Sequence, residues 1–249
     1  MGQKPDYGID SPHIVGGLAI FGVLVLIAAF LLWRIWAHSL AIFALLFGAY
    51  FLYSAAGMLY YSKVGKFGSR EQLLDRIPWQ GSERVLDVGC GRGLVLNAAA
   101  RRLTTGEAVG VDVWQEHAVS GNRREAVLEN ARREGVLDRV KVQESDARQL
   151  PFGDASFDVV VSNFVLHELK TAPDREKMVR EIVRVLKPGG HLALVDFIFT
   201  NECVHVLQAC GIADARRERP DRFGARITAI ISLGMTQLYC VTGSKPISS

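Results

Sequence analysis

Charged residues are scarce in the first quarter of this 249-residue chain. Only four of its 55 charged side chains lie within residues 1–62, which leaves 51 for the other 187 residues. The chain is 49% hydrophobic with a net charge of +3, a composition that excludes intrinsic disorder. Cysteine is also sparse, and the absence of a CxxC pair among the four cysteines excludes a disulfide scaffold. The chain therefore divides near residue 62 into an apolar part and a part with the charge content of a soluble domain.

Two long uncharged runs make up most of the apolar part. They span residues 14–33 and 40–61, and the segment RIWAHS connects them. A bilayer core about 30 Å thick needs about 20 helical residues, so each run is long enough to cross it. The small residues at 54–57 would let the two helices pack closely. The sequence therefore predicts an N-terminal tail (1–13) followed by a transmembrane hairpin (14–61).

Two other interpretations of the apolar part fit less well. A cleaved signal peptide has a shorter apolar stretch followed by a small-residue cleavage site. Buried helices of a soluble core are seldom apolar without interruption over this length. Lys63, Lys66 and Arg70 follow the second run with no acid among them, so the positive-inside rule places the large domain in the cytoplasm. We expect an integral membrane protein with two spans and its catalytic domain on the cytoplasmic face.

Strand and helix patterns alternate through the rest of the chain. After a linker and a short helix (62–83, with the helix at 70–77), apolar strands are expected at 84–88, 108–113, 140–144, 157–163, 191–197 and 237–242. Helical patterns lie between most of them, at 94–103, 123–134, 175–186 and 203–210, whereas residues 211–235 have no clear pattern. Strands joined by helical crossovers predict a mostly parallel sheet covered on both faces. We expect a Rossmann-like, doubly wound α/β domain over residues 84–243.

A glycine-rich loop carries the first chemical signal. The sequence DVGCGRG (87–93) follows a strand and opens a helix, so its backbone can approach a ligand closely. Asp112 ends the next strand, 23 residues after Gly89, where a carboxylate can accept hydrogen bonds from ribose hydroxyls. A dinucleotide fingerprint that starts at Gly89 would need Gly or Ala where this chain has Leu94. Asp87 suits the ammonium group of an amino acid better than a pyrophosphate.

Five motifs together resemble class I S-adenosylmethionine-dependent methyltransferases, of the branch that includes the ubiquinone/menaquinone-biosynthesis and sterol methyltransferases. They are, in order, DVGCGRG, VDV, SDARQLPF, FDVVVSNFVLHEL and EIVRVLKPGG, within about residues 84–196. The resemblance implies a seven-stranded, mostly parallel sheet whose last strand is antiparallel, and S-adenosylmethionine as the cofactor. The sequence WQEHAVSGN after Asp112 departs from the common pattern, because it makes a longer connection to the next helix.

The resemblance also implies roles for individual residues. The first motif would hold the methionine moiety, Asp112 the ribose hydroxyls, and Asp146 with Ala147 the adenine amino edge. Val113 or Trp114 would lie against the adenine, and Asn163 ends the fourth strand, where the methyl group meets the acceptor. The implied donor-binding residues are Asp87, Gly89, Cys90, Gly91, Gly93, Asp112, Val113, Trp114, Asp146, Ala147 and Asn163.

Several of these residues also have purely structural interpretations. Asp87 could cap the loop, Asp112 could be a solvated strand end, and Asp146 could cap the following turn. Cys90 is more consistent with packing than with a nucleophile. These alternatives stay open at the level of the sequence.

His167 is the candidate catalytic base. Methyl transfer is an in-line displacement for which the protein mainly supplies alignment and a dry pocket, and a base is needed only when the acceptor must lose a proton. A histidine near neutral pKa, with Glu168 beside it, can take that proton, although a packing role fits equally well. Asp196 and Asn163 end strands at the same sheet edge and complete the candidate catalytic set. The other histidines have no metal-ligand spacing, so no metal site is expected.

The surroundings of the domain point to the kind of acceptor. Arginine pairs on the helices are interleaved with acids, which does not indicate a nucleic acid partner. A domain tethered to a bilayer meets dissolved apolar molecules at raised effective concentration. The leading hypothesis is a membrane-anchored methyltransferase for a small, lipophilic acceptor such as a quinone-like ring, a lipid or another apolar metabolite. Alternatives are a small thiol or other soft nucleophile as acceptor, a donor-binding regulatory or scaffold protein without catalysis, and a dehydrogenase. The oligomeric state stays open.

Overall fold

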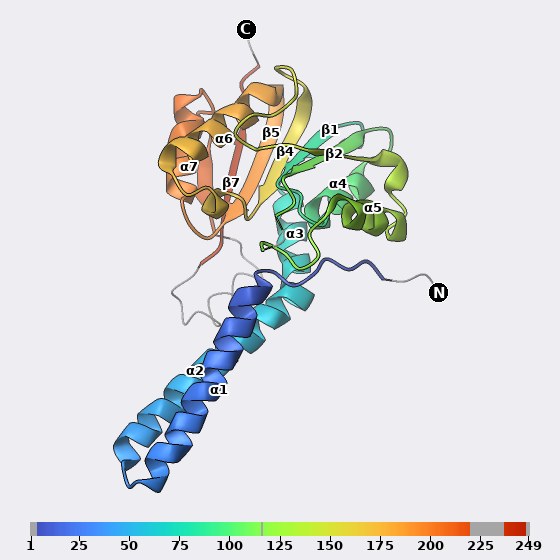
Figure 1. Cartoon of the computed structure of the whole chain (residues 1–249). Coiled ribbons are helices and arrows are strands. Elements are labelled where there is room, and N and C mark those ends of the chain that lie inside the picture. The colour runs from blue at the N-terminus through green and yellow to red at the C-terminus, as the bar shows by residue number, and fades with distance from the viewer. Residues whose placement is uncertain (1–3, 116, 220–236, 248–249) are drawn as a thin grey trace.

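The chain folds into an α/β domain from which a helical hairpin projects (Figure 1). The computed structural model describes residues 4–115, 117–219 and 237–247. The hairpin consists of α1 (Pro12–Arg34) and α2 (His38–Tyr60), which contain the two uncharged runs. Both helices are long and apolar enough to cross a membrane, by length and composition.

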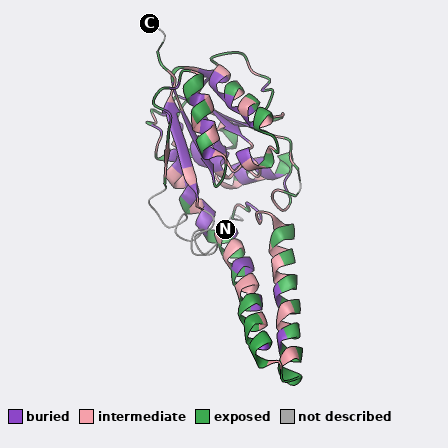
Figure 2. Ribbon diagram, turned by 90° about the vertical axis from the view of Figure 1, so that its left-hand side faces the viewer, coloured by how far each residue is buried: buried purple, intermediate pink, exposed green. Residues whose placement is uncertain are grey.

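Most residues of the hairpin are exposed or half-buried (Figure 2). Ile20, Phe30 and Phe43 are about two-thirds exposed. Core helices of a soluble domain bury such residues, and a large exposed apolar surface marks an interaction with another protein or a membrane.

The hairpin helices touch at two glycines. A Cβ atom added to Gly22 would lie 3.1 Å from the carbonyl oxygen of Gly48, and one added to Gly48 would lie 3.0 Å from that of Gly22. The sequence assigned close packing to residues 54–57, where Ser54 and Ala55 are buried but Ala56 is exposed. Gly22 and Gly48 therefore contribute a backbone contact that the predicted small-residue segment does not include.

Helix α2 continues into the α/β domain. One π-helical turn, η1 (Tyr61–Gly65), joins it to α3 (Lys66–Leu74). The short helix expected at 70–77 therefore begins four residues earlier, because the chain stays helical beyond the apolar run. This continuity ties the hairpin to the helical layer of the domain.

A seven-stranded sheet forms the centre of the domain, in the order β3-β2-β1-β4-β5-β7-β6. Strands β1 to β5 are parallel, whereas β7 is antiparallel to both β5 and β6. The predicted fold class is therefore confirmed. Strand β6 lies in the stretch that had no clear sequence pattern, and residues 220–236 of that stretch lie outside the described residues. The strands are β1 (Arg84–Val88), β2 (Glu107–Asp112), β3 (Val140–Glu144), β4 (Phe157–Asn163), β5 (Leu186–Asp196), β6 (Arg216–Glu218) and β7 (Tyr239–Ser244).

Helices cover both faces of this sheet. Side chains of β1 alternate between the faces, so that Val85 joins one apolar cluster and Leu86 the other. The first cluster includes residues of α3, α4 (Leu94–Arg102) and α5 (Arg124–Arg133). The second includes residues of α6 (Ala172–Val185) and α7 (Thr200–Ala209). Burial on both faces explains the apolar runs of the central strands β1, β2, β4 and β5.

The N-terminal tail packs on the α/β domain. The Ser11 N–H donates to the Ala118 carbonyl at 2.8 Å, and the Ser120 N–H donates to the Ile9 carbonyl at 2.9 Å. Ala118 and Ser120 belong to the long connection WQEHAVSGN after β2. The departure from the family pattern thus has a structural partner in this chain, namely residues 6–11, which we call the tail segment.

Candidate functional site

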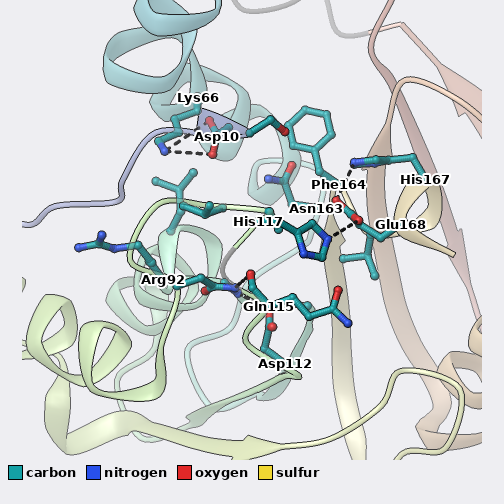
Figure 3. A pocket seen from close by; sticks show the side chains of 18 of the residues that line it. Asp10, Lys66, Arg92, Asp112, Gln115, His117, Asn163, Phe164, His167 and Glu168 are labelled. Atoms are coloured by element: carbon teal, nitrogen blue, oxygen red, sulfur yellow. Dashed lines mark hydrogen bonds and ion pairs between the residues drawn. The ribbon is translucent and has the colours of Figure 1, made fainter. Parts of the chain in front are cut away.

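A cavity of about 880 Å³ lies at the carboxyl ends of the parallel strands. Ligands of doubly wound α/β domains bind at this edge of the sheet. The cavity is lined by loops after β1 to β5, by the tail segment and by residues of both hairpin helices. In Figure 3, Lys66 and Asp10 lie at one end and Asp112 at the other, with His117 and Glu168 between them.

The glycine loop after β1 needs its glycines for conformation and space. Gly89, Gly91 and Gly93 have φ values of 73°, 55° and 83°, which side chains rarely adopt. A Cβ atom on Gly89 would clash with Val165, whereas one on Gly91 would meet no atom within 4 Å. The backbone at Gly91 therefore borders open space in the cavity. Gly93 is the N-cap of α4 and does not line the cavity.

Asp87 lies buried beneath this loop, with 1% of its surface exposed. Within the described residues, neither carboxylate oxygen has a hydrogen-bond partner of normal geometry. Burial raises the pKa of the Asp87 carboxyl to about 8, the charge of Asp112 adds to this increase, and the backbone N–H of Leu96 opposes it. A buried carboxylate is stable only when a cation or donor meets it. The position fits a positively charged group of a ligand.

Asp112 is held by backbone donors at the end of β2. The Gly91 N–H donates to Oδ2 at 2.7 Å and the Trp114 N–H to Oδ1 at 2.6 Å. Burial raises the pKa of this carboxyl, and the backbone donors of Gly91, Trp114 and Val113 oppose the increase. Each carboxylate oxygen has more than one acceptor position, so hydroxyl groups of a ligand can still bind.

Two of the implied donor-binding side chains have contacts of their own. The indole N–H of Trp114 donates to the Gly91 carbonyl at 3.1 Å and so stabilises the glycine loop. Trp114 is not among the cavity-lining residues. The Asp146 carboxylate pairs with Arg148 at 2.6 Å and also accepts the Arg148 backbone N–H at 2.8 Å. Asp146 still lines the cavity together with Ala147 and Val113.

Cys90 lies in the loop but packs inward. It is 5% exposed, and a Cβ atom on Gly110 would come within 2.8 Å of its Sγ atom. Burial raises the pKa of the Cys90 thiol well above its usual value, and the charges of Asp87 and Asp112 add to the increase. A thiol that stays protonated is a poor nucleophile, which agrees with a packing role.

His167 and Asp196 come together from neighbouring strand ends. The Nδ1 atom of His167 lies 3.2 Å from both carboxylate oxygens of Asp196, which is fully buried. Its Nε2 atom lies 3.3 Å from the carboxylate of Glu168, which is 3.7 Å from Nε2 of His117. Desolvation lowers the pKa of His167, but the hydrogen bonds and charges of Asp196 and Glu168 outweigh it, so the pKa is raised. Asp196 itself lies behind His167 and is not among the cavity-lining residues.

An aromatic wall, which the sequence analysis did not identify, surrounds His167. The centre of the Phe197 ring lies 4.7 Å from the centre of the imidazole, and the centre of the Phe164 ring lies 6.3 Å from it. The Tyr61 ring, just after the end of α2, packs edge-to-face on Phe164, with 6.3 Å between the ring centres. Phe164 has a φ of 61°, a strained conformation for an aromatic residue that is characteristic of functional sites. Phe164 and Phe197 directly follow β4 and β5, a position that could have revealed them.

Asn163 ends β4 and lines the cavity next to Phe164. Across residues 4–115, 117–219 and 237–247, no group of three or more His, Cys, Asp or Glu side chains is arranged to hold a metal ion.

The sheet order, the glycine loop after β1 and the acid that ends β2 define a class I S-adenosylmethionine-dependent methyltransferase fold. Residues 86–194 match the family model for a methyltransferase domain. Residues 86–194 are therefore a methyltransferase domain of the S-adenosylmethionine-dependent type, and S-adenosylmethionine is the cofactor of this domain.

Curated relatives and solved structures agree with this assignment. The 27-O-demethylrifamycin SV methyltransferase of Amycolatopsis mediterranei is 35% identical over 68% of this chain and 56% of its own length. The demethylmenaquinone methyltransferase of Lactiplantibacillus plantarum is 34% identical over 51% of this chain and 50% of its own. The chain thus spans about half the length of these relatives. A methyltransferase structure from Aquifex aeolicus shares the fold, with a TM-score of 0.52 and 23% identity over 70% of this chain and 88% of that one.

Proposed function

We propose that this protein is a membrane-anchored methyltransferase that transfers the methyl group of S-adenosylmethionine to a small, lipophilic acceptor. The observation that carries the proposal is a single cavity, lined by the glycine loop and Asp112 as well as by residues of both apolar hairpin helices. A donor site that opens toward an apolar hairpin suits an acceptor that partitions into a bilayer.

The donor would occupy the cavity along the ends of β1 and β2. The unpartnered Asp87 would bind the ammonium group of the methionine moiety, and the open backbone at Gly91 would let the donor pass close to the loop. Asp112 would accept hydrogen bonds from the ribose hydroxyls. Val113 and Ala147 would border the adenine, with the Asp146 carboxylate held to one side by Arg148.

His167 would accept the proton of a hydroxyl acceptor. When bound, S-adenosylmethionine supplies a methyl group activated by the sulfonium. The acceptor oxygen would take this methyl group, and the proton that the hydroxyl gives up would stay on His167. Asp196 would orient the imidazole through Nδ1, leaving Nε2 for the proton once Glu168 turns away from it. Phe164, Phe197 and Asn163 would position the acceptor and exclude water.

The proposed membrane anchor is the helical hairpin of α1 and α2. Large apolar side chains such as Ile20, Phe30 and Phe43 are about two-thirds exposed, and both helices are long and apolar enough to cross a bilayer. The basic residues just after the second run favour a cytoplasmic location for the α/β domain.

Methyl transfer in cells expressing the full chain tests the proposal. Cells receive methionine labelled in its methyl group, and the lipid extract is compared between the natural chain and Asp112→Ala. We expect label in a lipid-extractable product that depends on Asp112. Label confined to the aqueous fraction would contradict the lipophilic acceptor and favour a small thiol or other soluble nucleophile. A failure of the purified chain to bind S-adenosylmethionine by calorimetry would contradict the enzyme itself.

A further inference from the structure

The cavity extends past the donor site and along the hairpin. Its lining includes Ile14 and Leu18 of α1, and Tyr50, Phe51, Ser54 and Met58 of α2. All six belong to the uncharged runs that the sequence assigns to the membrane. We call this part of the cavity the hairpin groove.

The lining residues form one stripe on each helix. Tyr50, Ser54 and Met58 are spaced four apart, as are Ile14 and Leu18, so each set lies on a single helical face. At 1.5 Å per residue, Tyr50 lies about 17 Å along the axis from Tyr61. A hydrocarbon core is about 30 Å thick, so the groove would reach about halfway across it. The contact between Gly22 and Gly48 lies just beyond Tyr50 and Leu18 and closes the helix pair there.

The groove differs chemically from the opposite end of the cavity. Its one aliphatic hydroxyl, Ser54 Oγ, already donates to the Tyr50 carbonyl at 2.9 Å. Leu18, Phe51 and Met58 present apolar surface, and methionine adapts to irregular shapes. Apart from the Tyr50 phenol, none of its six residues is titratable, whereas the rest of the cavity carries the Asp10–Lys66 ion pair at one end and Asp112, His117 and Glu168 toward the donor loop (Figure 3). The cavity thus suits a molecule with a polar head and an apolar tail.

We propose that the hairpin groove holds the apolar tail of the acceptor while its head lies against Phe164 and Phe197 at the donor loop. The acceptor would then be methylated without leaving the bilayer, since its tail stays at the depth of the acyl chains. This inference rests on the proposed function and adds to it that the hairpin is a substrate-binding element as well as an anchor.

Photolabelling of the full chain tests the groove without requiring methyl transfer. The chain is reconstituted in vesicles of three parts phosphatidylcholine to one part phosphatidylglycerol. The probe is a decyl hydroquinone with a diazirine on its terminal carbon, and labelled sites are mapped by mass spectrometry. We expect several-fold more label at Leu18, Phe51 and Met58 than at the outward residues Phe30 and Leu46. An excess of unlabelled decyl hydroquinone should remove the label at the groove only.

Matched substitutions identify the site. Ser54→Trp should fill the groove and remove the label there, whereas Leu46→Trp on the exposed face should leave it unchanged. Calorimetry with S-adenosylmethionine should show equal donor binding for both variants, which confirms the fold. Equal labelling of groove and outward residues, or labelling at Leu18 that survives Ser54→Trp, would overturn the inference. Neither result would affect donor binding or the lipid-extract experiment, so a failure of the groove is distinct from a failure of the proposed function.

Discussion

At the scale of single residues, the donor site places two acids close enough to influence each other. Asp87 has no hydrogen-bond partner of normal geometry among the described residues, and its burial and the nearby Asp112 bring its pKa to about 8. At pH 7 this carboxyl is therefore mostly protonated. A bound ammonium group favours the carboxylate form, so binding should expel the proton.

Donor binding should therefore release a proton and strengthen from pH 6 to pH 7.5. Calorimetry at pH 7 in two buffers of different ionisation enthalpy measures the release. Asp87→Asn should remove it and weaken binding about tenfold to a hundredfold, the worth of a hydrogen bond to a charged group. Identical proton release in Asp87→Asn would show that another group titrates.

The rate of methyl transfer should rise with pH through the pKa of His167. The neutral imidazole is the base, and the carboxylates of Asp196 and Glu168 raise its pKa, so activity is lost at low pH. Asp196→Asn and Glu168→Gln should each lower the pKa and move the midpoint of the profile to lower pH. His167→Gln should reduce single-turnover methylation of the lipid extract about 10²- to 10⁴-fold with donor affinity unchanged. An unchanged rate in His167→Gln would instead indicate an acceptor that needs no base.

At the scale of elements, a buried lysine joins the tail segment to α3. The Lys66 ammonium donates to the carbonyls of Tyr7 and Gly8 at 2.7 and 3.0 Å and pairs with Asp10 at 3.3 Å. Lys66 is 4% exposed, and burial lowers its pKa against the opposing charge of Asp10. The tail segment is thus held by an element more than fifty residues away.

Lys66→Ala should release the tail segment. Loss of the hydrogen bonds to Tyr7, Gly8 and Asp10 should destabilise the fold by about 1–3 kcal/mol and raise amide hydrogen exchange at residues 6–11. Lys63→Ala is the matched control, because Lys63 is 55% exposed and lies 3.9 Å from Asp6. Equal exchange in both variants would show that Lys66 does not fasten the tail.

The glycine contact of the hairpin gives a second prediction at this scale. Gly48→Val would push a side chain into the Gly22 carbonyl and should cost about 1–3 kcal/mol, the usual effect of overpacking. Thermal unfolding in detergent micelles measures it. Gly17→Val should be close to neutral, since a Cβ atom there meets nothing within 4 Å. A melting temperature lowered equally by both would point to helix propensity rather than packing.

At the scale of the whole molecule, the proposed topology places the α/β domain in the cytoplasm and the connection between α1 and α2 on the opposite side of the membrane. A C-terminal fluorescent protein should then fluoresce in bacterial cells, and a C-terminal alkaline phosphatase should be inactive. The phosphatase inserted at residues 35–37, between the helices, should be active. The reverse pattern would place the α/β domain outside the cytoplasm.

The sequence by itself determined the parts and their order. Uncharged runs of about 20 residues predict helices at 14–33 and 40–61 because helix rise is constant. DVGCGRG between a strand and a helix predicts a ligand loop because glycines let the backbone approach a ligand closely. The family resemblance added the seven-stranded sheet with its antiparallel last strand, and the cofactor. These signals are local, so they are readable without a fold.

Only the tertiary structure decided how the parts meet. The Ile9 N–H donates to the Ser120 hydroxyl, 111 residues away in the sequence, and the Lys66 ammonium is buried against the tail segment. Asp196 lies behind His167 and does not line the cavity. The wall formed by Phe164, Phe197 and Tyr61 likewise joins three separate elements. Such contacts depend on the packing of distant segments, which leaves no periodic pattern in the chain, and they make the donor loop and the hairpin share one cavity.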